Sequence, residues 1–155
     1  MTDKGLFIEE NIINSVKKLI SGRVNELLGE TAYPIPPVEF GTYRGGSAVV
    51  PVIGLSTCER SEKERIIRLE AYTLTMTFAV PEYPSDPRSV GERNCYAYTS
   101  SVATALGENP TLGRAASRAV LTGKKYVPPK HPGTGEGWEI ILTLRITVEG
   151  GGYAG

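Results

Sequence analysis

The sequence predicts an α+β fold with a mostly antiparallel sheet of about five strands, in the order α-β-β-β-α-β-β, covered on one face by two helices. The strand-like segments alternate apolar and polar residues and follow one another through short turns, which favours antiparallel pairing. Helix-like segments occur only twice, whereas a doubly wound parallel sheet needs strand and helix to alternate strictly. The 155 residues suit a single domain over residues 1–149, followed by a flexible glycine-rich tail at residues 150–155.

The first helix is predicted to span Ile8 to Leu28. Apolar residues recur there at steps of three and four, so they form one stripe along the helix, and most charged residues lie off that stripe. Gly29 suits the C-terminal end of this helix, because glycine readily adopts the left-handed conformation that ends many helices. The proline-rich segment at residues 33–37 then favours an extended link.

Three strands follow in the prediction. Val38 to Tyr43 and Ala48 to Thr57 form a predicted hairpin around a turn at residues 44–47. The run from Glu59 to Glu70 carries four basic and four acidic residues, which is typical of a solvated turn or a strand end. Ile66 to Val80 is the longest predicted strand, and its period of two gives it one apolar face and one threonine face.

The second helix is predicted to begin at Asp86, a natural N-cap, with Pro87 in the first helical position. Gly107 is predicted to stop this helix. Its apolar stripe consists of Val90, Tyr98, Val102, Ala105 and Leu106. A short connection leads to two further predicted strands, Ala119 to Val127 and Trp138 to Val148, and the last of these places six apolar residues on one face.

Threonines repeat on the second face of two predicted strands. Thr73, Thr75 and Thr77 alternate along the longest strand, and Thr143 and Thr147 do so on the last one. One interpretation is an ordinary solvated face of an antiparallel sheet. The other is a candidate subunit interface, because short hydrogen-bonding side chains avoid the free energy needed to bury a charge. The sequence favours the two interpretations equally.

The composition excludes several classes of protein. The 17 basic and 17 acidic residues give a formal net charge of zero, whereas domains that bind nucleic acid normally carry a clear basic excess. Cys58 and Cys95 are too few for a disulfide framework, and with a single histidine they leave zinc short of ligands. The sequence predicts neither a signal peptide nor a membrane span. We therefore expect a protein with reduced cysteines that folds in the cytoplasm, has no sequence-specific nucleic acid as a partner and does not bind a membrane.

The sequence contains no recognisable catalytic constellation. His131 stands in a polar loop, which favours a solvated side chain. The glycine-rich loop at Gly133–Gly137 precedes a strand, whereas phosphate-binding glycines follow a strand and open a helix. We expect no enzymatic activity, no catalytic residue, no cofactor and no metal. The alternative from another class is a small cytoplasmic α+β enzyme or ligand-binding domain that uses His131 and this loop.

One segment resembles a known family. It comprises Ala105–Ala115, Arg118–Gly123 and Tyr126, and it is similar to the tail terminator, or tail-completion, family of long-tailed phages. In that family a helix commonly ends at an acidic-x-Thr-Leu-Gly-Gly turn, which leads into a strand with aliphatic positions. The N-terminal amphipathic helix, the proline-containing link and the β-hairpin before the second helix also match the architecture of the family.

Thr111, Leu112 and Gly113 match the turn of this family. By this resemblance we expect Thr111 to cap the turn, Leu112 to anchor it in the core, and Gly113 to supply the positive φ that reverses the chain. The second glycine of the family is replaced by Arg114, and the acidic position of the motif falls at residues 108–109.

The resemblance implies a virion structural protein without catalytic activity. Proteins of this family form a ring, commonly a hexamer, that caps the finished tail tube and provides the surface to which the filled head joins. The implied partners are copies of the chain itself, the tail tube protein, head–tail connector proteins and, in a contractile tail, the sheath. Such a protein is assembled in the host cytoplasm and resides in the tail or neck of the virion. A neighbouring neck protein, a sheath-associated tail protein and a homodimeric adaptor outside any virus remain alternatives.

Overall fold

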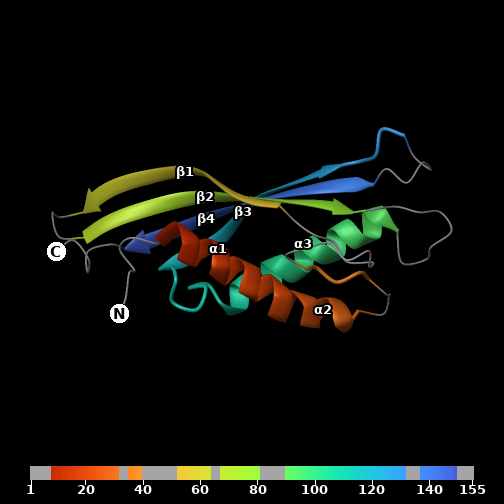
Figure 1. Ribbon diagram of the computed structural model, residues 1–155, viewed down its shortest axis with the longest axis horizontal. Coiled ribbons are helices and arrows are strands. Elements are labelled where there is room, and N and C mark those ends of the chain that lie inside the picture. The colour runs from red at the N-terminus through yellow and green to blue at the C-terminus, as the bar shows by residue number, and fades with distance from the viewer. Residues whose placement is uncertain are drawn as a thin grey trace.

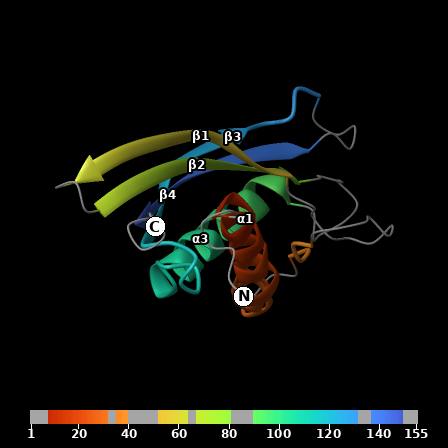
Figure 2. The same cartoon turned by 60° about the vertical axis from the view of Figure 1, so that its left-hand side comes forward.

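The computed structural model of the protein is a two-layer α+β sandwich (Figure 1). An antiparallel sheet of four strands forms one layer, and the described helices lie against the same face of this sheet, as Figure 2 shows from a second direction. The predicted α+β class and the antiparallel sheet are confirmed. The structure describes residues 8–31, 35–39, 52–63, 67–80, 90–131 and 137–149. The predicted tail at residues 150–155 lies outside these ranges.

A continuous rod of three helical segments forms half of the helical layer: α1 (Ile8–Leu19), the π-helix η1 (Ile20–Val24) and α2 (Asn25–Gly29). Its buried residues recur at every fourth position: Ile8, Ile12, Val16, Ile20, Val24 and Leu28. In an ideal α-helix such a stripe drifts by about 40° around the axis at each step. The i→i+5 bonds of the π-turn accommodate one additional residue and so return the stripe toward the sheet. The sequence predicts the helix but not the π-turn.

The second helix, α3 (Gly91–Glu108), begins later than predicted. Val90 has extended backbone angles, and its carbonyl accepts the N–H of Asn94 at 2.9 Å, so Val90 is the N-cap residue. Residues 86–87, where the sequence predicts the start of the helix, lie outside the described ranges, and the described helix starts after Val90. A helix in a protein is stabilised mainly by packing of its apolar face, and the buried residues of α3 begin at Gly91.

The end of α3 also differs from the prediction. Gly107 lies within the last helical turn, and Asn109 is the C-cap residue. The N–H of Asn109 donates to the carbonyls of Ala105 at 3.0 Å and Leu106 at 3.2 Å. The chain reverses only after this point, through the turn described below.

The sheet has the strand order β1-β2-β4-β3, and every neighbouring pair is antiparallel. Its strands are β1 (Val52–Lys63), β2 (Ile67–Val80), β3 (Arg118–Val127) and β4 (Trp138–Glu149). The last three agree with the predicted strands to within one residue at each end. The described part of the chain thus holds four strands, against the expectation of about five.

The charged run that the sequence assigns to a turn belongs largely to the β1–β2 hairpin. β1 continues into this run, and β2 starts within it. The register sets Arg60 opposite Glu70 and Glu62 opposite Arg68. Oppositely charged residues in cross-strand positions favour pairing, so the mixed signs of this segment suit two paired strands.

The predicted strand at residues 38–43 is not one of the four strands, and residues 40–51 lie outside the described ranges. Val38 is fully buried, and the side chain of Asn25 binds both of its backbone groups. The amide nitrogen of Asn25 donates to the Val38 carbonyl at 2.7 Å, and Asn25 Oδ1 accepts the Val38 N–H at 2.8 Å. These two bonds fix the extended link to the helical rod.

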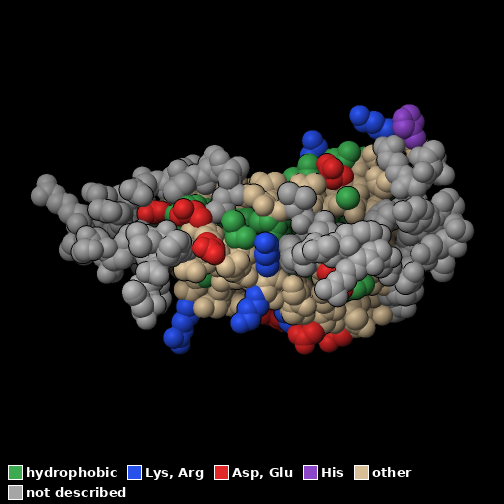
Figure 3. Space-filling view, in the orientation of Figure 1, with side chains coloured by type: hydrophobic (Ala, Val, Ile, Leu, Met, Phe, Trp, Pro, Cys, Tyr) green, Lys and Arg blue, Asp and Glu red, His purple; other side chains and the backbone are tan. Residues whose placement is uncertain are grey.

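The core lies between the two layers, and the space-filling view shows apolar side chains at the surface near the middle of one face (Figure 3). The rings of Phe78 and Tyr98 stack with their centroids 5.9 Å apart, which joins β2 to α3. The Tyr98 hydroxyl donates to the carbonyl of Pro36 at 2.6 Å, so the link after the rod is tied to α3 as well. Burial raises the pKa of Tyr98 well above its ordinary value, which keeps this hydroxyl protonated as a donor.

We expect Asn25→Ala to lower the free energy of unfolding by about 1–3 kcal/mol, because it leaves the buried N–H and carbonyl of Val38 without these partners. The matched control is Asn11→Ala at an exposed position of α1, which changes only helix propensity. Urea unfolding of both variants measures the difference. Equal stability of the two variants would show that Asn25 does not hold the link.

Candidate subunit interface

The candidate site is the face of the sheet that the helices leave open, called here the outer face. Side chains alternate along a strand, so the residues between the buried positions of β2 and β4 point away from the helices. The structure places five half-buried threonines together on this face: Thr73, Thr75, Thr77, Thr143 and Thr147. Their role as a subunit interface stays a prediction.

A row of small residues crosses the outer face from edge to edge. Gly54 of β1 lies opposite Thr75 of β2. Thr143 of β4 lies opposite Thr75 on one side and opposite Gly123 of β3 on the other. A Cβ atom added to Gly54 would meet nothing within 4 Å, and one added to Gly123 would meet the Thr143 side chain at 3.6 Å. The centre of the outer face therefore carries little side-chain bulk.

Each edge strand has a β-bulge beside this row. The register of β1 shifts at Ser56, and that of β3 shifts at Thr122. The Thr122 hydroxyl donates to the Thr143 carbonyl at 3.2 Å, which closes the bulge of β3 against its neighbour. Bulges bend a strand and increase its twist, and the sheet curves along its length (Figure 1).

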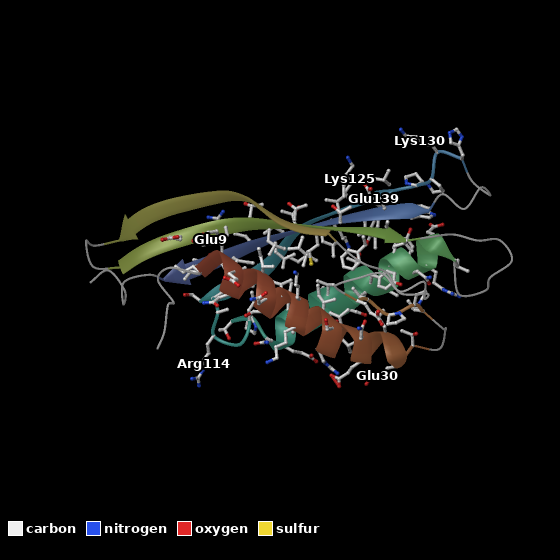
Figure 4. The ribbon with its side chains drawn as sticks, viewed as in Figure 1. Glu9, Glu30, Arg114, Lys125, Lys130 and Glu139 are labelled. Carbon is white, nitrogen blue, oxygen red and sulfur yellow. The ribbon has the colours of Figure 1, made fainter. Side chains whose placement is uncertain are left out.

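Short neutral side chains dominate the middle of the outer face. Arg145 is the exposed charge that stands between Thr143 and Thr147 on β4. Glu139 and Lys125 lie on the same side of the sheet, toward its other end (Figure 4). Threonine side chains have little conformational entropy to lose on burial, and their hydroxyls can pair with polar groups of a partner. The arrangement suits contact with another protein surface.

The turn after α3 contains the residues that carry the family resemblance. Leu112 is 2% exposed, so its side chain anchors the turn in the core. Gly113 has a φ of +65°, in the left-handed region that glycine adopts most easily. Thr111 is exposed, and its carbonyl accepts the N–H of Ala116 at 3.0 Å.

Asn109 caps this turn in the structure. Its Oδ1 accepts the N–H of Gly113 at 3.2 Å, and its carbonyl accepts the N–H of Leu112 at 3.1 Å. The described contacts include no hydrogen bond from the side chain of Thr111, which was expected to cap. Asparagine suits this role because its short side chain reaches backbone groups a few residues ahead.

Three consecutive residues of the turn have positive φ: Leu112 at +50°, Gly113 at +65° and Arg114 at +77°. The left-handed conformation costs a residue other than glycine about 1–2 kcal/mol. Burial of the Leu112 side chain offsets this free energy. Arg114 is exposed, so burial provides no such compensation there.

The turn and the outer face form two separate sites. Leu112 belongs to the core between the layers, whereas the threonines lie on the opposite side of the sheet. A backbone hydrogen bond of 2.8 Å from the Ser117 N–H to the Thr147 carbonyl joins the segment after the turn to β4. The structure therefore does not gather the sequence-predicted residues into one site.

The residues weighed for catalysis lie in different elements. His131 is exposed after β3, and Cys95 is a buried cysteine in α3 that forms no disulfide. The side chain of Cys58 and residues 132–136 of the glycine-rich loop are outside the described ranges. Among the described residues, no group of three His, Cys, Asp or Glu side chains is placed to hold a metal ion. Within the same ranges, no helix combines the length and the apolar character needed to cross a membrane.

The sequence analysis missed Gly54, Gly123 and the capping role of Asn109. A signal was present for each of the two glycines, because an isolated glycine inside a strand pattern often marks a bulge or a close backbone approach. Asn109 stands before a proline, and that dipeptide favours a turn. The left-handed backbone of Arg114 had no such signal, since arginine has no preference for that conformation.

No protein-family model matches the chain, and no curated protein sequence matches it. The outer face and the turn after α3 are therefore the observations that bear on function.

We expect Leu112→Ala to lower the free energy of unfolding by about 2–5 kcal/mol, because it removes a buried anchor from the core. Gly113→Ala should lower it by about 1–2 kcal/mol, because alanine is strained at the φ of this position. The control is Gly107→Ala in α3, where an added Cβ likewise meets nothing within 4 Å and helix propensity rises. The thermal midpoint of each variant measures the change in stability. If Gly107→Ala lowers the midpoint as much as Gly113→Ala does, the positive φ of Gly113 is not the cause of the destabilisation.

Proposed function

We propose that the protein is a structural subunit of a long-tailed phage virion, a tail terminator whose ring caps the tail tube and joins it to the head. The observation that carries the proposal is the outer face, which the helical layer leaves open and whose centre is a row of glycine and threonine residues. The turn at Thr111, Leu112 and Gly113 resembles that of the tail terminator family, and this resemblance is why we propose that family.

The composition of the outer face supports burial against protein. The centre of a protein interface is poor in charged residues, and the threonine and glycine row across the sheet meets this condition. Because little side-chain bulk stands at the centre of this face, a partner surface can approach the sheet closely. The zero net charge of the chain adds little long-range repulsion between copies.

A head-to-tail contact fits the outer face better than a twofold one. Pairing two outer faces around a twofold axis through their centre would bring Arg145 of one copy toward the same residue of the other. Such like charges oppose association. A contact between the outer face and a different surface of the next copy avoids this repulsion, and repetition of such a contact closes a ring when the rotation per subunit divides a full turn. We propose a ring of this kind, a hexamer by the family resemblance.

The proposed partners are the tail tube protein on one side of the ring and head–tail connector proteins on the other, with the sheath added in a contractile tail. A role as a neighbouring neck protein would use the same outer face. For the alternative of an enzyme or ligand-binding domain, His131 is an exposed residue after β3, and it lies in a different element from the buried Cys95 of α3.

Thr143→Lys should raise the concentration at which half of the protein assembles about tenfold or more, because it places a charge at the centre of the outer face. The control is Thr104→Lys, the same change at an exposed position of α3. Light scattering reports the mass, which for a ring is a multiple of the 16.7 kDa subunit. A wild-type protein that stays monomeric, alone and with tail tube protein, would contradict the proposed function.

His131→Ala should leave ring formation and the yield of intact particles unchanged, because this exposed residue lies off the outer face and the turn. Particle yield from phage that carry the variant measures the effect. A chemical turnover of the wild-type protein that disappears in His131→Ala would support the enzyme instead.

A further inference from the structure

One end of the outer face carries an exposed apolar residue between two arginines. Val120 of β3 is 37% exposed, and Arg145 of β4 lies directly opposite it. Arg118 stands two residues before Val120 on the same side of β3, because Ala119 between them is buried in the core. Both arginines, called here the arginine pair, are exposed diagonal neighbours on adjacent strands. Their like charges disfavour the isolated sheet, whereas arginine is enriched at protein interfaces.

The other end of the outer face holds a carboxylate. Glu139 of β4 is exposed there, at a diagonal position to the exposed Lys125 of β3 (Figure 4). From Arg145 to Glu139 the strand covers six residues, which an extended chain spans in about 20 Å. The threonine and glycine row lies between these two ends. The outer face therefore has a basic end, a neutral centre and an end with a carboxylate.

The helical rod presents a second long surface on the opposite side of the subunit. Its buried residues recur at every fourth position and face the sheet, so residues halfway between them point away from it. These residues form a stripe, called here the rod stripe, that is exposed along the whole rod: Glu10, Asn14, Lys18, Gly22, Glu26 and Glu30. Figure 4 shows Glu30 and Glu139 on opposite sides of the subunit.

The charges of the rod stripe are complementary to those of the outer face. The stripe has two glutamates, Glu26 and Glu30, where the outer face has the arginine pair, and it has Lys18 where the outer face has Glu139. From Glu30 to Lys18 the rod covers twelve residues, about 18 Å at the rise of an α-helix, which is close to the span of β4 above. A Cβ added to Gly22, between them, would meet nothing within 4 Å. The rod stripe thus matches the outer face in charge order, in length and in lack of bulk near its middle.

We propose that the rod stripe, from Lys18 to Glu30, lies across the outer face of the next copy of this chain. Its two glutamates bind the arginine pair, Lys18 binds Glu139, and the rod covers Val120. This contact rests on the ring proposed above and names the surface that the outer face meets. Because the two surfaces lie on opposite sides of one subunit, the contact is head-to-tail and repeats from copy to copy. The opposite charges at its two ends fix the direction in which the rod lies.

The first test places a side chain at Gly22. Gly22→Gln fills space that is open in the subunit and raises helix propensity, so its thermal midpoint should not fall below that of the wild type. The concentration at half-assembly should rise about tenfold or more, because the added side chain holds the rod away from the sheet of the next copy. The matched control is Gly107→Gln, the same change at an exposed glycine of α3 that also has nothing within 4 Å, and it should assemble as the wild type does.

The second test exchanges the charges. Arg118→Glu with Arg145→Glu, and Glu26→Lys with Glu30→Lys, should each prevent ring formation, whereas the chain that carries all four changes should assemble again. Light scattering and sedimentation report the mass, and thermal midpoints show that each variant folds. Wild-type assembly of Gly22→Gln, or a folded fourfold variant that stays monomeric, overturns this contact and leaves the ring intact. A wild-type chain that never assembles overturns the proposed function instead.

Discussion

The pairing of β2 with β4 is the constraint on which the rest of the structure depends. Twelve residue pairs run without interruption from Leu69 opposite Glu149 to Val80 opposite Trp138. Because side chains alternate along both strands, this one register decides which residues form the core and which form the outer face. A slip of one residue would turn the threonines toward the helices and the aliphatic residues toward solvent. The core and the candidate interface are thus two sides of the same hydrogen-bonded ladder.

Features encoded in a local repeat were predictable from the sequence. The alternation in β2 and β4 fixed both strands to within a residue, and it separated the threonines from the core. The amphipathic stripe of the rod fixed the extent of the first helix. The buried Leu112 and the positive φ of Gly113 follow from a motif in which each residue type has a specific conformational reason. In these cases neighbours along the chain carry the necessary information.

Features that depend on tertiary partners were not predictable in the same way. Val38 is held by the side chain of Asn25, a residue of the helical rod, so the pattern around it resembles a strand that does not join the four-stranded sheet. The start of α3 coincides with its first buried residue, Gly91, and therefore depends on tertiary packing. The charged run pairs across a hairpin, and its sign pattern has meaning only once the register is known. The left-handed backbone of Arg114 belongs to a reversal of the chain, and the buried side chain of Leu112 anchors that reversal in the core.

The two bulges also decide how the subunit can and cannot aggregate. An edge strand that is flat and regular invites a strand of another molecule to add to it, which leads toward fibres. Here β1 is interrupted at Ser56 and β3 at Thr122, and β3 carries the exposed pair Lys124 and Lys125 beyond its bulge. Such interruptions and lysines disfavour strand addition. A newly made chain is therefore protected at both edges of its sheet against loss to open-ended β-polymers.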